Sequence, residues 1–212
     1  MVQLMDILDS FNIEEKLHRN PHSSDESWWD GPERFEYVNR NVVSKIQNED
    51  LFKFIKILAP SKIGLNIGGL LKSGKRSNYC DEKPTYTKLL NIIEPCDIIA
   101  RAEKLPFEDN SIGYIVSFHT LEHISGDIKD ILSEWVRVLV PGGLIGISMP
   151  DKRYFLHDSN NTKDGVYAYN EMSPDELITI CKELNNVKVL LFDDRKNNFD
   201  FDLIIRKICH PG

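Results

Sequence analysis

The sequence predicts an α/β fold built on a doubly wound, mostly parallel sheet, and three observations support this prediction. From residue 61 onward, short apolar runs alternate with segments of helical periodicity. The first of these runs, residues 63–67, ends at Gly68, where a backbone-permissive turn is expected. The last two runs, residues 187–192 and 201–208, flank a polar turn and predict a C-terminal antiparallel hairpin. Apolar strands joined by helices are typical of parallel sheets that are covered on both faces.

Residues 1–60 are predicted to form a helical extension that covers an edge of the sheet. Apolar residues recur there at helical spacing in two stretches, Leu4, Ile7, Leu8 and Phe11, then Phe35, Val38, Val42 and Ile46. A third helix is expected over residues 49–58, ending before Pro60. Trp28 and Trp29 lie in the polar segment between the first two stretches. We expect them to anchor the helices, with a place in a lid or an acceptor wall as the alternative.

Residues 61–212 are predicted to form one Rossmann-like domain. In chain order, the elements expected after the first strand are a strand at 114–119, a helix at 127–140, a strand at 144–149 and a helix from 173 to about 185. The apolar residues of the first helix share one face, and the Pro-Gly-Gly of residues 141–143 should end it. Ser173 as N-cap, followed by Pro174 and Glu176, indicates the start of the second helix.

Composition and charge exclude several classes of protein. Lys and Arg number 26 against 33 Asp and Glu, which leaves a net charge of −7. Nucleic acids and anionic membranes bind cationic surfaces, so neither is expected as the main partner. The four cysteines are far apart and show no spacing typical of a zinc site. The N-terminal residues lack a basic leader and an apolar core, and no apolar run is long enough to span a bilayer. We therefore expect a cytoplasmic protein.

Candidate functional residues follow the strands, because ligands of open α/β sheets bind beyond the carboxyl ends of the strands. Gly68 and Gly69 follow the first strand, where missing side chains let the backbone approach a ligand closely. An ordinary tight turn is the alternative at these two glycines. Asp81 lies near the expected end of a second strand, and its carboxylate can accept two hydrogen bonds from a ribose diol. The alternative for Asp81 is a solvated acid in a loop.

The order of these features resembles a known family. The stretch AEKLPFEDNSIGYIVSFHTLEHI, followed by EWVRVLVPGGLIGISMPDKRY, closely resembles class I S-adenosylmethionine-dependent methyltransferases. The resemblance is greatest to a small group with LNIGCG-like, LPF, LEH, PGG and PDKR motifs. It implies S-adenosylmethionine as cofactor, no metal, and a set of cofactor-binding residues. That set is Asn66, Gly68, Gly69, Asp81, Ala102, Glu103, Ser117, Phe118 and His119.

The resemblance also implies what each part of this set contacts. Residues 66–69 face the methionine part of the cofactor, and Asp81 holds the ribose. Ala102 and Glu103 contact the adenine, and residues 117–119 line the pocket near the sulfonium and the acceptor. In the LEH motif, Glu122 and His123 are expected to serve mainly packing and capping.

Four residues are candidates for catalysis. Transfer to an oxygen or nitrogen atom requires removal of a proton from the acceptor, for which a histidine or a carboxylate is suited. His119, Asp151, Tyr154 and His157 all follow strand ends. The alternative for the His157-Asp158 pair is an ordinary polar loop. The acceptor implied by the PDKR group is a small molecule or a saccharide, and the helical extension is compatible with a monomer or a dimer.

Three departures from the family pattern support a second hypothesis. Leu70 occupies a position that is normally small, Arg101 stands where the family has an acid that accepts from the adenine, and Gly113 replaces an aspartate. Arginine cannot accept a hydrogen bond. The alternative function is therefore a catalytically impaired, methyltransferase-like partner or regulatory subunit. A nucleotide-dependent enzyme such as a dehydrogenase is disfavoured, because the chain lacks GxGxxG.

Overall fold

The structure of the protein is a computed structural model, and it describes eight ranges of the chain. These ranges are 51–61, 63–68, 71–72, 75–76, 87–91, 96–154, 169–193 and 200–208. The chain divides into two compact units, Met1–Asp50 and Leu51–Gly212, and all described residues belong to the second. Trp28, Trp29 and the two helices expected before residue 49 lie outside the described residues. The boundary predicted after residue 60 therefore stays a prediction.

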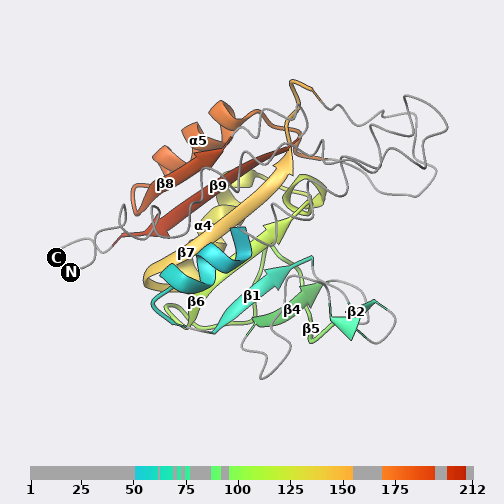
Figure 1. Cartoon of the computed structure of the whole chain (residues 1–212), viewed down its shortest axis with the longest axis vertical. Coiled ribbons are helices and arrows are strands. Elements are labelled where there is room, and N and C mark those ends of the chain that lie inside the picture. The colour runs from blue at the N-terminus through green and yellow to red at the C-terminus, as the bar shows by residue number, and fades with distance from the viewer. Residues whose placement is uncertain are drawn as a thin grey trace, which may run out of the picture. The chain divides into compact units, whose positions relative to one another are not determined.

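The core of the second unit is a seven-stranded sheet with the order β5-β4-β1-β6-β7-β9-β8 (Figure 1). In this order the strands are Ile98–Ile99, Thr87–Asn91, Gly64–Ile67, Ile112–Phe118, Leu139–Pro150, Asp200–Lys207 and Val187–Asp193. The first five strands run parallel, β9 pairs antiparallel with β7, and β8 pairs antiparallel with β9. The α/β fold with a C-terminal antiparallel hairpin is thereby confirmed.

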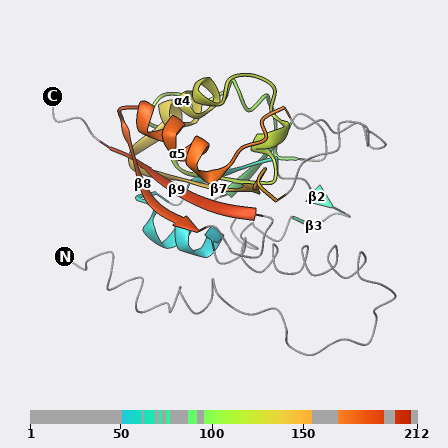
Figure 2. The same ribbon diagram turned by 90° about the horizontal axis from the view of Figure 1, so that it is seen from above.

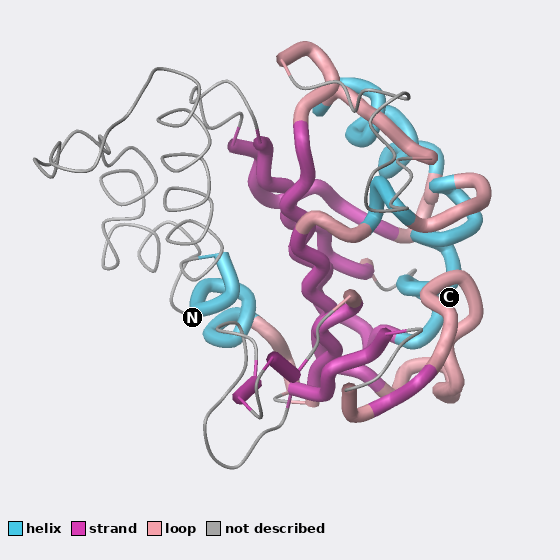
Figure 3. Tube along the Cα trace, turned by 90° about the vertical axis from the view of Figure 1, so that its right-hand side faces the viewer, coloured by secondary structure: helices cyan, strands magenta, loops and turns pink. Residues whose placement is uncertain are grey.

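Helices cover both faces of this sheet. Helices α4 (Ile128–Val138) and α5 (Pro174–Glu183) lie on one face, and the helical residues 51–58 lie on the other (Figures 2 and 3). Side chains of the strands pack against both helical layers, because successive side chains of a strand point to opposite faces of the sheet. Ile115 belongs to the core cluster that contains the buried residues of α4 and α5. Its neighbour Tyr114 stacks edge-on against Phe52 of the opposite layer.

Helix α4 is two residues shorter than predicted at its C-terminus. Asp127 caps its start by accepting hydrogen bonds from the backbone amides of the second and third helical residues. The helix ends at Val138, and Lys207 donates to the carbonyl oxygens of Arg137 (3.3 Å) and Leu139 (2.8 Å). The Pro-Gly-Gly segment lies inside β7, where the register with β6 shifts. Lys207 therefore satisfies carbonyls at the end of the helix, where the last carbonyls have no partner within the helix.

Helix α5 begins as the sequence predicts. Both the backbone amide and the hydroxyl of Ser173 donate to Glu176 Oε2 at 2.8 Å, as in a capping box. Lys152 also pairs with Glu176. The hydrogen bonds from Lys152 and Ser173 lower the pKa of Glu176 to about 2. The helix ends at Glu183, and β8 and β9 then form the predicted hairpin.

The second strand of the parallel sheet lies elsewhere than predicted. Strand β4 pairs with β1 and spans Thr87–Asn91, so it follows Asp81 in the chain instead of preceding it. Between β1 and Asp81, the strands formed by the described residues are the two-residue strands β2 (Leu71–Lys72) and β3 (Lys75–Arg76), which form a separate hairpin. The premise that Asp81 stands at the end of the second strand is therefore wrong. Asn91 stands there instead.

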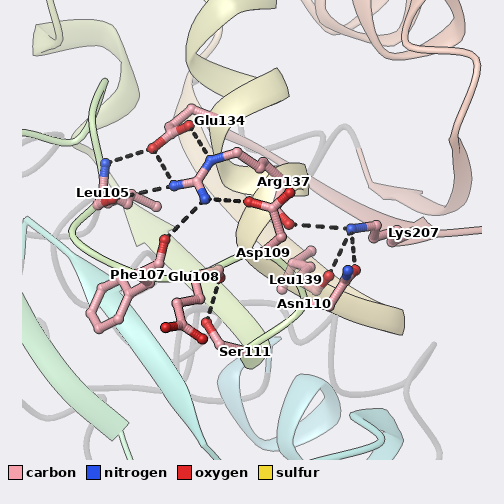
Figure 4. Close-up of polar contacts among 10 residues, drawn as sticks. All are labelled: Leu105, Phe107, Glu108, Asp109, Asn110, Ser111, Glu134, Arg137, Leu139 and Lys207. Atoms are coloured by element: carbon pink, nitrogen blue, oxygen red, sulfur yellow. Dashed lines mark hydrogen bonds and ion pairs between the residues drawn. The ribbon is translucent and has the colours of Figure 1, made fainter.

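The LPFEDNS segment is held by a single arginine of α4 (Figure 4). The guanidinium of Arg137 donates to the carbonyls of Leu105 (3.3 Å) and Phe107 (2.9 Å) and to Asp109 Oδ1 (2.6 Å). Glu134 accepts from Arg137 and also from the backbone amide of Leu105 at 2.7 Å. These bonds, led by the one from Arg137, lower the pKa of Glu134. The segment between β5 and β6 is thereby held against α4.

Candidate functional site

The carboxyl ends of β1 and β4 meet at a turn that requires glycine. Gly68 has a φ of +84°, and a Cβ at this position would collide with the side chain of Thr120. Its amide donates to the carbonyl of Leu90 (2.8 Å), and its own carbonyl accepts from Asn91 Nδ2 (3.0 Å). Asn66, two residues earlier, is buried. The turn after β1 is thus held directly against the end of β4.

The segment after β5 carries the residues predicted to contact adenine. Ala102 is buried, and its carbonyl accepts a hydrogen bond from the indole of Trp135 at 2.9 Å. Glu103 is partly exposed and accepts from Nε of Arg101 at 2.7 Å. The Arg101 side chain is 66% exposed. The arginine that departs from the family pattern therefore pairs with the neighbouring acid.

The end of β6 brings together the residues expected near the sulfonium. Ser117 is fully buried, Phe118 is the last residue of the strand, and His119 is partly exposed. His119 has a φ of +49°, which is uncommon for a residue other than glycine. Its backbone amide donates to the carbonyl of Ser148 on β7 (2.9 Å). Residues in sparsely populated backbone conformations cluster at functional sites, and His119 stands at the sheet edge where ligands of this fold bind.

Two carboxyl groups face the imidazole of His119. Glu122 Oε1 lies 3.9 Å from Nδ1, and Asp200 Oδ2 lies 3.7 Å from Nε2. Glu122 Oε1 is also 3.7 Å from Nε2 of His123. Asp200 comes from β9, whose antiparallel direction places its amino end beside the carboxyl end of β7, opposite Pro150. A residue near the C-terminus of the chain thereby joins the loop that follows β6.

Glu122 is the most strongly perturbed carboxyl group at this end of the sheet. Its side chain is 3% exposed, and Oε2 has no hydrogen-bond partner among the described residues. Burial, with a smaller contribution from the charge of Asp200, raises the pKa of Glu122 to about 8. Glu122 therefore carries its proton at neutral pH. Such a group can exchange a proton near neutrality, which an ordinary exposed glutamate does not do.

The remaining predicted catalytic residues divide into two groups. Asp151 is buried, and both of its carboxylate oxygens accept from Arg153, with Nε at 2.9 Å from Oδ2. This bidentate pairing organises the turn after β7. Tyr154 follows that turn and is 53% exposed. Gly69, Asp81 and His157 lie outside the described residues, as does Leu70.

Gly113, one of the three departures, lies far from this end of the sheet. It is the second residue of β6, five residues before Phe118, which corresponds to about 16 Å along the strand. A Cβ at Gly113 would collide with the backbone oxygen of Ser61. Its amide donates to the carbonyl of Ile63 at 2.8 Å. Close backbone packing therefore explains this glycine, and it does not line the candidate site.

Three residues at this end of the sheet were not predicted as site residues. Asn91 was missed because its strand was placed too early. Glu122 was assigned to packing, and only its burial beside two imidazoles indicates otherwise. Asp200 had one available signal, the alternation of acids with apolar residues in the Asp-Phe-Asp start of β9. An acid in a buried strand is uncommon and marks a position with a specific partner or function.

Neither a metal site nor a membrane span is found in the described part of the chain. No group of three or more His, Cys, Asp or Glu side chains among the described residues could hold a metal ion. No helix formed by those residues is long and apolar enough to cross a membrane.

Comparisons with known proteins agree with this architecture. Residues 64–147 match the model of the methyltransferase domain family. An S-adenosylmethionine-dependent methyltransferase from Thermotoga maritima is 19% identical, with a TM-score of 0.51 over 84% of this chain and 98% of its own. One from Mesorhizobium loti is 11% identical, with a TM-score of 0.53 over 72% and 95%. The search of curated proteins found no match.

A third solved structure contains a ligand related to the expected cofactor. The 1,6-didemethyltoxoflavin-N1-methyltransferase from Burkholderia thailandensis was solved with 1,6-didemethyltoxoflavin and S-adenosylhomocysteine bound. It is 12% identical, with a TM-score of 0.53 over 87% of this chain and 94% of its own. At such identities the likeness shows the fold alone. Residues 64–147 match the methyltransferase domain model, and the chain has the Rossmann-like fold of the S-adenosylmethionine-dependent methyltransferases that it resembles.

Proposed function

We propose that the protein transfers the methyl group of S-adenosylmethionine to an oxygen or nitrogen atom of a small-molecule or saccharide-type acceptor. The observation that carries this proposal is His119, held at the end of β6 between the carboxyl groups of Glu122 and Asp200. An imidazole in this position is suited to accept the proton that the acceptor loses. The cofactor, when bound, supplies a methyl group that is already activated on a sulfonium.

The residues at the carboxyl ends of the strands fit this cofactor chemically. The side-chain amide of Asn91 both donates and accepts, which suits ribose hydroxyls at the end of β4. The turn at Gly68 brings the backbone to the same place. The carboxyl groups of Glu103 and Asp200 favour the positive charge of a sulfonium over an anion. Asn66, Gly69, Asp81, Ser117 and Phe118 stay predicted cofactor contacts.

Exposed aromatic side chains support an uncharged, ring-shaped acceptor. Tyr154 and Tyr169 are 53% and 58% exposed. The backbone amide of Tyr169 donates to the carbonyl of Glu122 at 2.7 Å, which places it beside the candidate site. Tyrosine combines an apolar ring face with a hydroxyl, and both suit a sugar or a heterocycle. The net charge of −7 supports such an acceptor over a polyanion.

The alternative, a non-catalytic partner or regulatory subunit, loses part of its basis. Gly113 lies at the opposite end of β6, and Arg101 pairs with Glu103. Of the three departures, Leu70 supports the non-catalytic alternative as strongly as before, and it lies outside the described residues. Calorimetry with S-adenosylmethionine and S-adenosylhomocysteine separates the two functions. Micromolar binding of either supports the enzyme, and absence of binding at millimolar concentration supports the partner protein.

Two variants test where the ribose is held. Loss of hydrogen bonds to the diol should weaken cofactor binding by about 1–3 kcal/mol, or roughly 5- to 150-fold. If the end of β4 holds the ribose, Asn91→Ala shows this loss and Asp81→Ala does not. The reverse result supports the carboxylate of Asp81. If both variants bind as tightly as the wild type, the proposed location of the cofactor is wrong.

Methyl transfer itself is tested with a panel of acceptors. The protein is incubated with methyl-labelled S-adenosylmethionine and small hydroxyl compounds, amines and saccharides, and labelled products are measured. Replacing His119 by alanine should lower the rate by roughly 10²- to 10⁴-fold while leaving cofactor affinity within a few-fold. Retention of the full rate by His119→Ala would remove the imidazole from the mechanism. Absence of labelled product with every acceptor, despite cofactor binding, would favour the non-catalytic alternative.

A further inference from the structure

Glu122 occupies a position that packing alone does not explain. It is the central residue of the short 3₁₀ helix Leu121–His123, and its side chain turns into the protein. Oε1 lies within 4 Å of two imidazoles, those of His119 and His123, and Oε2 is buried without a partner among the described residues. Burying a polar group without compensation costs free energy, and an apolar residue here would avoid that cost.

Among the described residues, few charges near Glu122 could hold it ionised. The described titratable groups that face it are the imidazoles of His119 and His123 and, from β9, the carboxyl group of Asp200. From the segment before α5, the backbone amides of Tyr169 and Asn170 donate to its carbonyl oxygen at 2.7 and 3.1 Å. No lysine or arginine of the described residues forms an ion pair with it. Its charge state therefore depends on the two imidazoles more than on any permanent cation.

We propose that Glu122 is a positioning residue for His119, a buried counter-charge that is neutral while the imidazole is neutral and ionised when the imidazole is charged. This inference rests on the proposed function. Asp200, an acceptor when ionised, favours the His119 tautomer that carries its hydrogen on Nε2, because that nitrogen faces the carboxylate. Nδ1, on the side of Glu122, is then the atom that accepts a proton.

The proton balance of the step is complete. The acceptor loses its proton to Nδ1 of His119 as its oxygen or nitrogen bonds to the methyl group, and the methyl–sulfur electron pair returns to sulfur. The imidazolium then lies beside Glu122, and an adjacent positive charge favours the carboxylate form. Glu122 releases its own proton to water, which leaves an imidazolium between two carboxylates. Burial raises the pKa of Glu122 to about 8, so the carboxyl starts this cycle protonated at neutral pH.

A histidine titration followed by NMR tests the proposal without cofactor or acceptor. The imidazole signals of His119 and His123 are recorded from pH 5 to 10 in the wild type and in Glu122→Gln, which is nearly isosteric but cannot ionise. In the wild type, Glu122 ionises near pH 8, and both imidazole signals should respond to the charge that then appears beside them. Glu122→Gln cannot ionise, so this response should be absent from its titration curves.

Two further variants make the result specific. Glu183→Gln removes an exposed carboxylate that pairs with Lys129 on the helical surface, and it should leave both histidine titrations unchanged. Glu122→Asp keeps an ionisable group and should restore a large part of the wild-type titration, including where Glu122→Gln folds poorly. Identical His119 titrations in the wild type and Glu122→Gln, or in Glu122→Asp and Glu122→Gln, would overturn the proposal. Loss of cofactor binding would overturn the proposed function instead, because this titration does not depend on it.

Discussion

The stability of Glu122→Gln relative to the wild type should increase as the pH rises from 5 to 8. In the folded protein the pKa of Glu122 is about 8, against 4.5 for the unperturbed carboxyl group. Between these two pH values the folded state holds a proton that the unfolded chain has released. The free energy of unfolding of the wild type therefore falls with rising pH across this window. Glutamine has no proton to release, so the free energy of unfolding of the variant does not fall with pH for this reason.

The magnitude follows from the two pKa values. Each pH unit between them corresponds to roughly 1.4 kcal/mol, so the full difference approaches about 5 kcal/mol at pH 8 and above. At pH 7 the loss in the wild type is about 3 kcal/mol, and near pH 5 it is below about 1 kcal/mol. The amide of glutamine lacks partners in the same site, which adds a constant cost of about 1–3 kcal/mol. The quantity to measure is therefore how the difference in the free energy of unfolding between Glu122→Gln and the wild type changes with pH.

Urea denaturation at several pH values provides this measurement. Wild type, Glu122→Gln and the surface control Glu183→Gln are unfolded in urea between pH 5 and 9, and free energies are compared at each pH. The difference between Glu122→Gln and the wild type should grow by about 3 kcal/mol or more between pH 5 and 8 and then stay constant. The control should show no such trend. A difference that is the same at pH 5 and pH 8 would mean that Glu122 ionises like an exposed glutamate.

Three further predictions concern contacts that hold the strands and helices around the candidate site in place. Each is tested by measuring the free energy of unfolding of the variant. Arg137→Ala should cost about 3 kcal/mol, because the carbonyls of Leu105 and Phe107 lose their donor, and Arg137→Lys should recover less than half of it. Gly113→Ala should cost about 1–3 kcal/mol, because its Cβ meets the rigid backbone of Ser61. Lys207→Met should cost about 1 kcal/mol through the carbonyls at the end of α4. Wild-type stability in any of these variants would contradict the corresponding contact.

The elements that could be predicted are those whose signals are local. Helix α5 has its N-cap, its proline and its glutamate within four residues, and the capping box forms as expected. Strands β8 and β9 have apolar runs on both sides of a polar turn, which defines a hairpin without distant partners. The predicted start of helix α4 at residue 127 agrees with the structure, in which Asp127 is the N-cap. Its end was misplaced because Leu139 and Val140 belong to strand β7, where Leu139 pairs with Ile112 of β6.

Strand β4 could not be placed from the sequence for a physical reason. Its residues, TKLLN, mix polar and apolar side chains over only five positions, and hydrophobic periodicity is weak in so short a run. What makes this segment a strand is pairing with β1, which lies about 20 residues earlier. The ribose contact predicted at Asp81 depended in part on where this strand ends, and it stays a prediction.

The candidate site was predicted in part for a related reason. His119 follows a clear strand, so its position could be inferred from the end of that strand. Its neighbours could not. Asp200 reaches His119 only because β9 runs antiparallel to β7. Glu122 differs from an ordinary helix-start glutamate only by its burial, which depends on how the whole sheet edge is packed.

The motifs that carry the family resemblance are mostly structural in this protein, and the proposed chemistry depends largely on residues outside them. Arg137, in the stretch EWVRVLVPGG, binds the LPF segment and thereby fixes the chain that carries Ala102 and Glu103. The glycines of PGG shape the irregular start of β7. These contacts would be needed in any protein with this fold, whatever its acceptor. Proton transfer, by contrast, is assigned to His119 with Glu122 and Asp200, and of these only Glu122 belongs to a recognised motif. The family resemblance therefore predicts the frame and the cofactor, while the proposed proton transfer depends on side chains that the fold brings together from the end of β6 and the start of β9.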